Sequence, residues 1–291
     1  MDSTVADSYR YCQRLARRTG RNFYFSFLPL PRPLFRDMCA LYAFMRVTDD
    51  LGDDESRSPA QRQAALRSWR GELDAVLAGE RPSHPVVAAL ADVQRRHEIP
   101  PEYLHAVITG VESDLRPAEI ETFAELSDYC YHVAGAVGLC CIHVWGFADP
   151  RAKERAVDCG VAFQLTNILR DLRADAQAGR VYLPREDLRQ FDYSADDLRG
   201  SVRDERFRAL MRFQVERARR YYERGAALHA LLAPPGRPIL ASMIAIYGRL
   251  LRTIERRQYD VFTRRIEIPI RTKLTIAATH LFRPGRKPVL P

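Results

Sequence analysis

The sequence predicts an all-α protein that folds as a single helical domain over residues 1–291. Helical signals dominate the chain, strand-like alternation is nearly absent, and no repeat or low-complexity linker divides it. An apolar fraction of 46% is enough for a substantial core, and an ordinary charged fraction of 28% argues against disorder. One helical domain is therefore the expected architecture.

Short sequence signals mark where several helices begin. Ser58 and Gln61 form a capping box, with Pro59 at the first helical position. Thr122 and Glu125 form a second capping box ahead of a long apolar run. Further prolines stand where helices should start, at Pro33, Pro85 and Pro101.

These signals place the elements in order along the chain. We expect helices near 4–19, 33–53, 59–79, 85–97, 101–115, 122–147, 150–176, 203–232 and 237–259. The stretch 177–202 carries Gly, Pro and charges, so it is expected to form a long loop with short helical turns. The tail from about 262 is basic and less regular, interrupted by Pro269 and Pro284.

Charge, cysteines and the start of the chain narrow the kind of protein. A net charge of +8 indicates an anionic partner. The arginines are scattered among acidic residues, which argues against a nucleic-acid-binding surface. The six cysteines lack zinc-type spacing, and most sit among apolar residues, as expected for buried thiols in a reducing compartment. With no signal pattern and no apolar stretch of roughly twenty residues, we expect a cytoplasmic protein.

Two segments each carry aspartates four residues apart. LYAFMRVTDDLGDD contains Asp49 and Asp53, and GVAFQLTNILRDLRAD contains Asp171 and Asp175. Residues at this spacing lie on the same face of a helix, one turn apart. Like charges there repel each other, and a bound cation turns that repulsion into ligation. A lone pair of this kind is usually a solvated helix face, but two pairs in apolar helices indicate a site.

Polar neighbours extend each aspartate pair into a stripe along its helix. Tyr42 and Arg46 precede the first pair at intervals of four and three residues, and Gln164 and Asn167 precede the second at intervals of three and four. The helix that carries the second stripe is otherwise apolar enough to be largely buried. Its polar stripe is therefore expected to line an internal cavity.

Oxygen ligands at this spacing suit Mg²⁺, which keeps several waters and combines one or two carboxylates with phosphate oxygens. Mn²⁺ is an alternative ion. Two facing stripes would hold such ions around a diphosphate, and metal neutralisation makes diphosphate a better leaving group. An apolar cavity would shelter the allylic cation that remains.

Four segments resemble the squalene/phytoene synthase family: NFYFSFLPLP, YAFMRVTDDLGD, YCYHVAGAVG and QLTNILRDLRADAQAGRVYLP. The similarity runs from about Tyr11 to Tyr259, and the last segment is long and highly specific. The resemblance implies an isoprenoid synthase fold with a central cavity. It also implies head-to-head (1′–1) condensation of two prenyl diphosphates through a cyclopropylcarbinyl diphosphate.

The resemblance also implies roles for individual residues. Metal binding is implied for Asp49, Asp53, Asn167, Asp171 and Asp175. Contact with the substrate is implied for Phe23, Arg46, Gln164, Asn167, Arg180, Tyr182 and Tyr247. Together with the four aspartates, Arg46 would act on the diphosphate and Tyr42 near the reacting centre. Arg180 and Tyr182 fall in a GRVYLP segment that resembles a flap closing over the diphosphate.

Some positions carry weaker expectations. Phe23 and Tyr247 resemble aromatic residues of the family's cavity, where π faces stabilise carbocations, and simple core packing is an equal alternative. Glu112 and Asp114 match a segment near the cavity but are not expected to bind metal. Residues 20–22 depart from the small hydroxyl residues that many members carry there, so part of the diphosphate contact stays open.

The segments TDDLGDD and NFYFSF resemble the bacterial squalene and hopanoid branch of the family. We therefore expect farnesyl diphosphate as substrate and presqualene diphosphate as product, with NADPH needed only if the reaction continues to squalene. One alternative is a phytoene synthase that acts on geranylgeranyl diphosphate. Another is a non-catalytic scaffold protein, which would have no need for the aspartate pairs.

The basic end of the chain suggests one further partner. Its charges could attract the anionic inner face of a membrane, with a solvated tail as the alternative. These charges belong to Arg264, Arg265, Arg271, Lys273, Arg283, Arg286 and Lys287.

Overall fold

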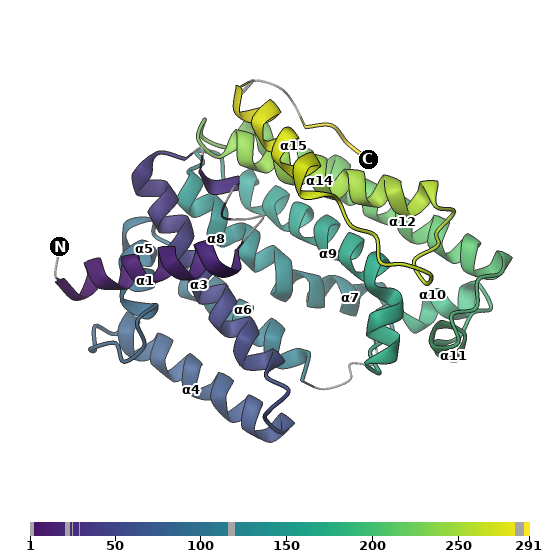
Figure 1. The fold of residues 1–291 in the computed structure, drawn as a ribbon, viewed down its shortest axis with the longest axis horizontal. Helices are drawn as coiled ribbons and strands as arrows, with labels where there is room; N and C mark the ends of the chain where they lie inside the picture. Colours follow the sequence, from purple (N-terminus) through teal and green to yellow (C-terminus); the bar gives the residue numbers. More distant parts are fainter. Residues whose placement is uncertain (1–2, 21–23, 25, 29, 116–119, 283–287) are drawn as a thin grey trace.

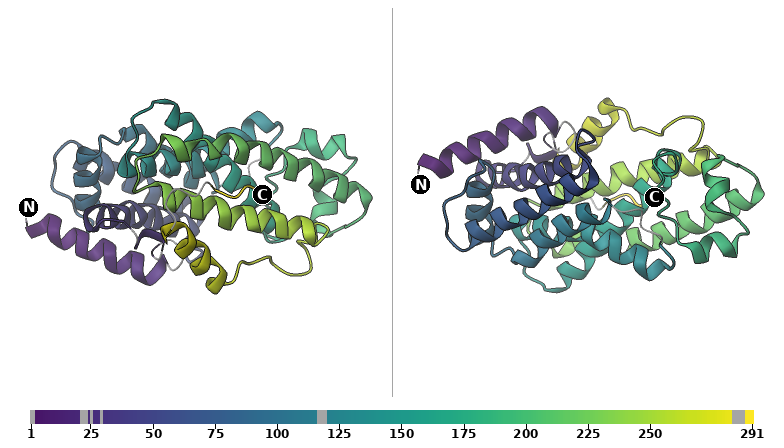
Figure 2. Two further views of the ribbon diagram at one scale, coloured as in Figure 1. Left: turned by 90° about the horizontal axis from the view of Figure 1, so that it is seen from above. Right: turned by 90° about the horizontal axis from the view of Figure 1, so that it is seen from below.

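The computed structural model describes the whole chain except residues 1–2, 21–23, 25, 29, 116–119 and 283–287. The described residues form an all-α fold, as the sequence predicts, with one isolated bridge between Phe147 and Leu232. Figures 1 and 2 show an elongated bundle with the first helices gathered at one end and α9 (Arg151–Gln177) running through its middle. No helix within the described ranges has the length and apolar character needed to cross a membrane.

In the first half of the bundle, the described residues include five helices near their predicted positions. They are α1 (Ser3–Thr19), α3 (Arg32–Asp53), α4 (Pro59–Leu77), α5 (Val87–Arg96) and α6 (Pro101–Ser113). The predicted capping box at the start of α4 is present. The backbone N–H of Gln61 donates to Ser58 Oγ at 3.3 Å, and the Ser58 N–H donates to the Gln61 side chain at 2.9 Å.

In the second half, the main difference from the prediction is that long predicted helices are divided into shorter ones. The expected helix over 122–147 contains a π-helical turn, η1 (Tyr131–Gly135), between α7 (Phe123–Cys130) and α8 (Ala136–Trp145). The stretch 177–202 carries the short helices α10 (Arg185–Gln190) and α11 (Ala195–Arg199). The remaining helices are α12 (Glu205–Ala226), α13 (Leu228–Leu231), α14 (Arg237–Arg256) and α15 (Ile270–Phe282).

The tail is more regular than its sequence predicts. Residues 270–282 form α15, which packs against α14, where the composition led us to expect less regular structure. Pro269 does not interrupt this helix but immediately precedes it. The Lys273 N–H donates to the Pro269 carbonyl at 3.1 Å and closes the first turn. A proline at a helix start loses no intrahelical hydrogen bond, which explains the difference.

Two glycines set how closely the neighbours of α9 approach it. A Cβ on Gly160 would lie 2.7 Å from backbone atoms of Ala134 and Gly135 in η1. A Cβ on Gly225 of α12 would lie 2.9 Å from the backbone nitrogen of Cys159. These contacts involve backbone atoms, so the helices can meet at this distance only without side chains there.

We expect Gly160→Ala to destabilise the protein by about 2 kcal/mol, because a new methyl group here can be accommodated only by shifting a helix. Urea unfolding would show this as a lower midpoint at an unchanged slope. Gly71→Ala on α4 is the matched control, since nothing lies within 4 Å of a Cβ there. That substitution should be neutral or stabilising. Equal losses in the two variants would contradict the packing argument.

Candidate active site

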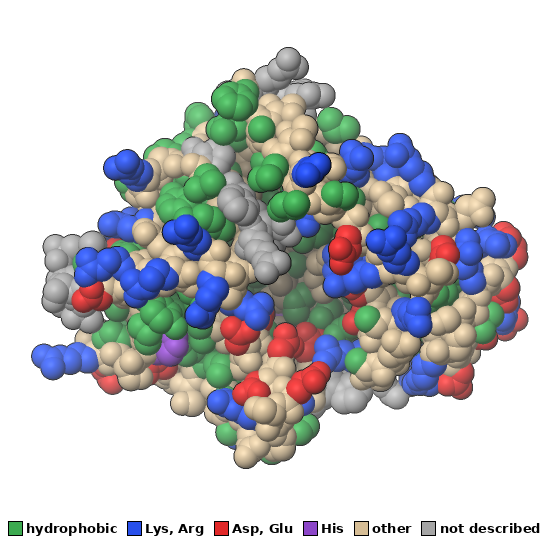
Figure 3. Space-filling model, in the orientation of Figure 1, with side chains coloured by type: hydrophobic (Ala, Val, Ile, Leu, Met, Phe, Trp, Pro, Cys, Tyr) green, Lys and Arg blue, Asp and Glu red, His purple; other side chains and the backbone are tan. Residues whose placement is uncertain are grey.

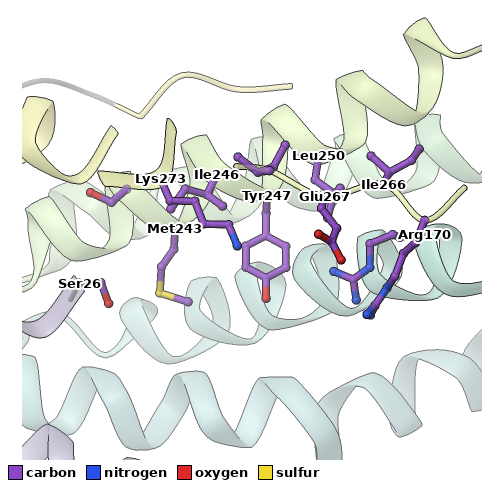
Figure 4. A pocket seen from close by; sticks show the side chains of 12 residues that line it. Ser26, Arg170, Met243, Ile246, Tyr247, Leu250, Ile266, Glu267 and Lys273 are labelled. Atoms are coloured by element: carbon purple, nitrogen blue, oxygen red, sulfur yellow. The ribbon is translucent and has the colours of Figure 1, made fainter. Parts of the chain in front are cut away.

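Two neighbouring cavities lie between α9, α14 and the helices beside them. The first, about 370 Å³, is lined by Arg170, Tyr247, Arg265 and Lys273 among others. The second, about 180 Å³, is mostly apolar and lies between η1, α8, α9 and α14. Met243 and Tyr247 line both cavities, and Figure 4 shows Tyr247 reaching from α14 toward α9. Figure 3 shows a hollow in the middle of one face of the molecule, with acidic side chains along its edge.

The first predicted polar stripe lies on the last turns of α3. Tyr42 and Arg46 are half-buried, whereas Asp49 and Asp53 are exposed at the end of the helix. Arg46 forms an ion pair with Asp50, one turn further along. The stripe therefore runs from the interior of the bundle to an open rim, with its carboxylates at the rim.

The second stripe lies on the buried helix α9. Asn167 Nδ2 donates to Gln164 Oε1 at 3.3 Å, and both residues line the second cavity. Asp171, one turn further on, accepts hydrogen bonds from Arg265 at 2.9 and 3.2 Å and from Arg170 Nε at 2.9 Å. The polar side of α9 thus changes from amides beside the apolar cavity to carboxylates surrounded by guanidinium groups.

Asp114 lies between the two aspartate pairs. Its charge acts on Asp49 of α3 and on Asp175 of α9. Its Oδ1 accepts hydrogen bonds from Tyr129 Oη at 3.0 Å and from Tyr182 Oη at 2.9 Å, and these two rings stack 5.0 Å apart. Both pairs therefore border one shared acidic region.

Arg180 and Tyr182 border the same region, from the segment predicted to close over a diphosphate. Arg180 hydrogen-bonds Tyr182, and its charge acts on Asp114 and Asp175. The Arg180 N–H also donates to the Asp175 carbonyl at 2.8 Å, which ties this segment to the end of α9. The segment thus lies directly beside the second aspartate pair.

The acidic region changes the ionisation of its carboxylates. Partial loss of solvent in the cleft, followed by the charge of Asp53, raises the pKa of Asp49 to about 7. Burial, followed by the charge of Asp171, raises the pKa of Asp175 to about 6. Burial acts on Asp171 too, but the guanidinium groups beside it hold its pKa below the usual value. Each pair therefore contains one carboxylate that is costly to ionise alone and would gain from a nearby cation.

The raised pKa of Asp175 gives the metal-free protein a pH dependence. Its folded state keeps a proton that the unfolded state releases, so stability falls as the pH rises from about 4 to about 6. Asp175→Asn removes this loss. Thermal unfolding is measured with a chelator present. Above pH 6 the variant should have a melting temperature several degrees higher than wild type, and near pH 4 the two melting temperatures should be equal. A gap of constant size across this range would contradict the assignment.

Tyr247 belongs to an aromatic group at the junction of the cavities. Its ring stacks on Phe163 of α9 with centroids 4.6 Å apart, and both rings line the second cavity. Phe163 also contacts Tyr222 of α12 at 5.9 Å. Aromatic rings at a cavity wall are able to stabilise a cation through cation–π attraction. Phe23, the other predicted cavity aromatic, lies outside the described residues.

The donor set can be compared with the predicted metal. Within the described residues, no three His, Cys, Asp or Glu side chains are grouped to hold an ion by themselves. Mg²⁺ does not require such a group, because it keeps several waters and combines one or two carboxylates with phosphate oxygens. The residues present therefore fit an ion that binds together with a diphosphate, and the raised pKa values of Asp49 and Asp175 fit carboxylates that gain from one.

Three residues near the aspartates were not assigned to the site from the sequence, and one of them, Arg265, was assigned only to the basic tail. Arg170 directly precedes Asp171, and Tyr129 begins the YCYHVAGAVG segment, so each had a local signal. Arg265 had none, because it lies 94 residues from the carboxylate that it contacts. Its role at the site appears only once the chain is folded.

A helical bundle with two acidic helix faces beside apolar cavities is the architecture of an isoprenoid synthase. The sequence model of the squalene/phytoene synthase family matches residues 16–272 of this chain. A phytoene synthase of Arthrospira platensis is 36% identical, over 94% of this chain and 92% of the relative. A 15-cis-phytoene synthase of Synechococcus elongatus is 35% identical, again over 94% of this chain and 92% of the relative.

Solved structures agree with this assignment. A dehydrosqualene synthase has a TM-score of 0.85 at 29% identity and covers 94% of this chain and 95% of its own. Squalene synthase HpnC from Alicyclobacillus acidocaldarius has a TM-score of 0.83 at 29% identity, over 89% and 97% of the two chains. The chain belongs to the squalene/phytoene synthase family. This family contains prenyltransferases that join prenyl diphosphates head to head and generally depend on a divalent metal.

Proposed function

We propose that this protein joins two molecules of geranylgeranyl diphosphate head to head and forms phytoene in a Mg²⁺-dependent reaction. The observation that carries the proposal is the coupling of both aspartate pairs through Asp114, beside a cavity with mostly apolar walls. Bound Mg²⁺ would neutralise diphosphate and make it a better leaving group. A non-catalytic scaffold would gain nothing from carboxylates that raise each other's pKa.

The side chains divide the work by position. The four aspartates of the two pairs, with Asn167, would hold the ions. Arg46 and Arg180 would bind diphosphate oxygens, and the guanidinium groups around Asp171 add positive charge at the same place. Tyr42 would stand near the reacting centre. Tyr182 attaches the GRVYLP segment (residues 179–184), called the covering segment below, to the acidic region through its hydrogen bond to Asp114.

The apolar cavities serve the carbon chemistry. Loss of diphosphate from one substrate leaves an allylic cation, whose C1 bonds to the double bond of the second substrate, and loss of a proton closes a cyclopropane ring. Departure of the second diphosphate, ring opening and loss of another proton give phytoene without a reductant. Phe163 and Tyr247 present π faces that stabilise the cations, while Gln164 lies at the boundary between apolar wall and polar stripe.

The sequence segments led us to expect farnesyl diphosphate as the substrate, whereas we now propose geranylgeranyl diphosphate. Relatives named phytoene synthase, at 35% and 36% identity over most of the chain, support the longer substrate. The second cavity has mostly apolar walls, as a prenyl chain of either length requires. Farnesyl diphosphate is the second candidate, because solved structures similar to this chain are named dehydrosqualene synthase and squalene synthase.

The proposal is tested by incubating the purified protein with Mg²⁺ and either diphosphate, with and without NADPH, and measuring the mass of the extracted lipid. We expect phytoene from geranylgeranyl diphosphate without NADPH. Products from farnesyl diphosphate alone would reject the chain length. Failure to consume either substrate would reject the proposed activity.

Cys141→Phe provides a sharper test of chain length. Cys141 is half-buried and lines the second cavity, so a phenyl ring there would shorten the space for a prenyl chain. Turnover of geranylgeranyl diphosphate relative to farnesyl diphosphate should fall at least about tenfold. Farnesyl diphosphate turnover is the internal control for folding, and an unchanged ratio would show that this cavity does not select chain length.

A further inference from the structure

The helix α15 has its apolar side facing outward. Ile270, Leu274, Leu281 and Phe282 are 47%, 44%, 37% and 81% exposed, and we call these four residues the α15 outer face. Ile270 and Leu274 are four residues apart, and Leu281 follows seven residues later. This spacing keeps the three side chains on one side of the helix. Each of these four residues is more than one third exposed.

The inner side of α15 is the more polar one. His280 is 4% exposed, and Lys273 is half-buried and lines the first cavity. A helix at the surface of a water-soluble bundle normally shows the opposite arrangement, with apolar residues inward. Figure 3 shows hydrophobic side chains gathered over the part of the molecule where α15 lies in Figure 1. The outer face is therefore expected to contact an apolar partner.

The charge of the tail indicates the partner. Between residues 262 and 291 the sequence carries seven basic residues and one acidic residue, Glu267. Of the seven, Arg265 pairs with Asp171, Lys273 lines the first cavity, and three lie outside the described residues. Arg264 and Arg271 are exposed on either side of the start of α15. Apolar side chains bordered by Lys and Arg match an anionic lipid surface, where acyl chains accept the first and headgroups attract the second.

A second copy of the chain matches this face less well. Pairing two α15 helices would bring the two basic ends together, which like-charge repulsion opposes. At about 1.5 Å per residue, the 13 residues of α15 span only about 20 Å. Such a strip is smaller than the roughly 800 Å² per partner that a stable dimer buries.

We propose that the α15 outer face docks this protein on an anionic lipid bilayer. With 13 residues, α15 is too short to span a membrane, so it lies along the surface with its four apolar side chains in the interface. Lys273 of the same helix lines the first cavity, so α15 lies between that cavity and the outer face. If the proposed function holds, this arrangement places a reaction with hydrocarbon chains directly beneath the lipid.

Vesicle flotation with the purified full chain tests the docking without any substrate. Wild type should bind vesicles that contain phosphatidylglycerol, bind pure phosphatidylcholine vesicles weakly, and dissociate as salt is raised. Leu274→Glu should weaken binding to the anionic vesicles at least about tenfold, and Arg271→Gln about fivefold. Ala64→Glu, which adds the same charge at an exposed position of α4, should leave binding unchanged.

Several results would overturn the docking proposal. They are no binding of wild type to anionic vesicles, equal binding by wild type and Leu274→Glu, or an equal loss in Ala64→Glu. A wild-type dimer that becomes a monomer in Leu274→Glu, without vesicle binding, would assign the face to self-association instead. Diphosphate release in detergent should be unchanged in Leu274→Glu, so loss of docking and loss of the proposed activity are separate readouts.

Discussion

Asp175→Asn and Asp49→Asn should each reduce Mg²⁺-dependent diphosphate release at least about a hundredfold, because each removes a charge that would hold the ions on the leaving group. Both variants keep the shape of the side chain. Both should fold at least as well as wild type without metal, since each removes a carboxylate whose pKa is raised in the folded protein. Loss of activity together with unchanged or higher melting temperature is the expected result.

Measuring both activity and melting temperature distinguishes a metal-binding role of these aspartates from a structural role. Asp171 is less suitable for this test, because its removal would also leave Arg170 and Arg265 without their shared partner. Glu154→Gln is the matched control, an equal loss of charge at an exposed position on α9. Diphosphate release, measured across Mg²⁺ concentrations, should be normal in the control. Full turnover by either aspartate variant would remove that residue from the proposed site.

Asp37→Ala should destabilise the protein by about 3 kcal/mol, because it breaks a buried ion pair and leaves its partners behind. Asp37 is 0% exposed. It accepts hydrogen bonds from Arg96 at 2.6 and 2.9 Å and contacts His97 Nε2 at 2.8 Å, while Arg96 also donates to Tyr9 Oη at 2.6 Å. This network joins α1, α3 and the end of α5, so it holds the helix that carries the first aspartate pair.

Urea unfolding measures this loss, with Asp128→Ala as the control. The Asp128 side chain is 75% exposed, so its removal should cost less than about 0.5 kcal/mol. Burial acts to raise the pKa of Asp37, but its hydrogen bonds from His97 and Arg96 hold that pKa below the usual value. The stabilisation is therefore present above about pH 4 and lost on further acidification, so the gap from wild type should narrow there. A difference near zero at neutral pH would show that the network carries no net stability.

Most helices could be predicted because their signals are local. A capping box such as Ser58–Gln61 acts within one turn, and α4 begins where it predicts. The tail was predicted less well, since Pro269 was interpreted as an interruption although it precedes α15. The π-helical turn η1 was also not predicted. A single π-helical turn does not change the spacing of apolar residues enough to be recognised in the sequence.

The candidate site also has some features that local sequence predicts and others that depend on how helices pack. The aspartate pairs follow from helix geometry alone, because residues four apart share a face in any α-helix. The role of Asp114 does not follow, since it depends on the end of α6 lying near α3, near Asp175 of α9 and beside Tyr182. The sequence segments favoured farnesyl diphosphate, whereas the relatives named phytoene synthase favour the longer substrate. Chain length depends on the space that several helices enclose, which short motifs do not encode.

By itself, the sequence determined the helical class, the two acidic stripes and membership of the squalene/phytoene synthase family. Each of these depends on residues within a few turns of one another or on similarity along the chain. Only the tertiary structure decided that Arg265 meets Asp171, that Asp114 joins the aspartate pairs, and that α15 turns its apolar side outward. These features depend on how distant helices pack, because packing sets which charges share a cleft and which side chains are left uncovered.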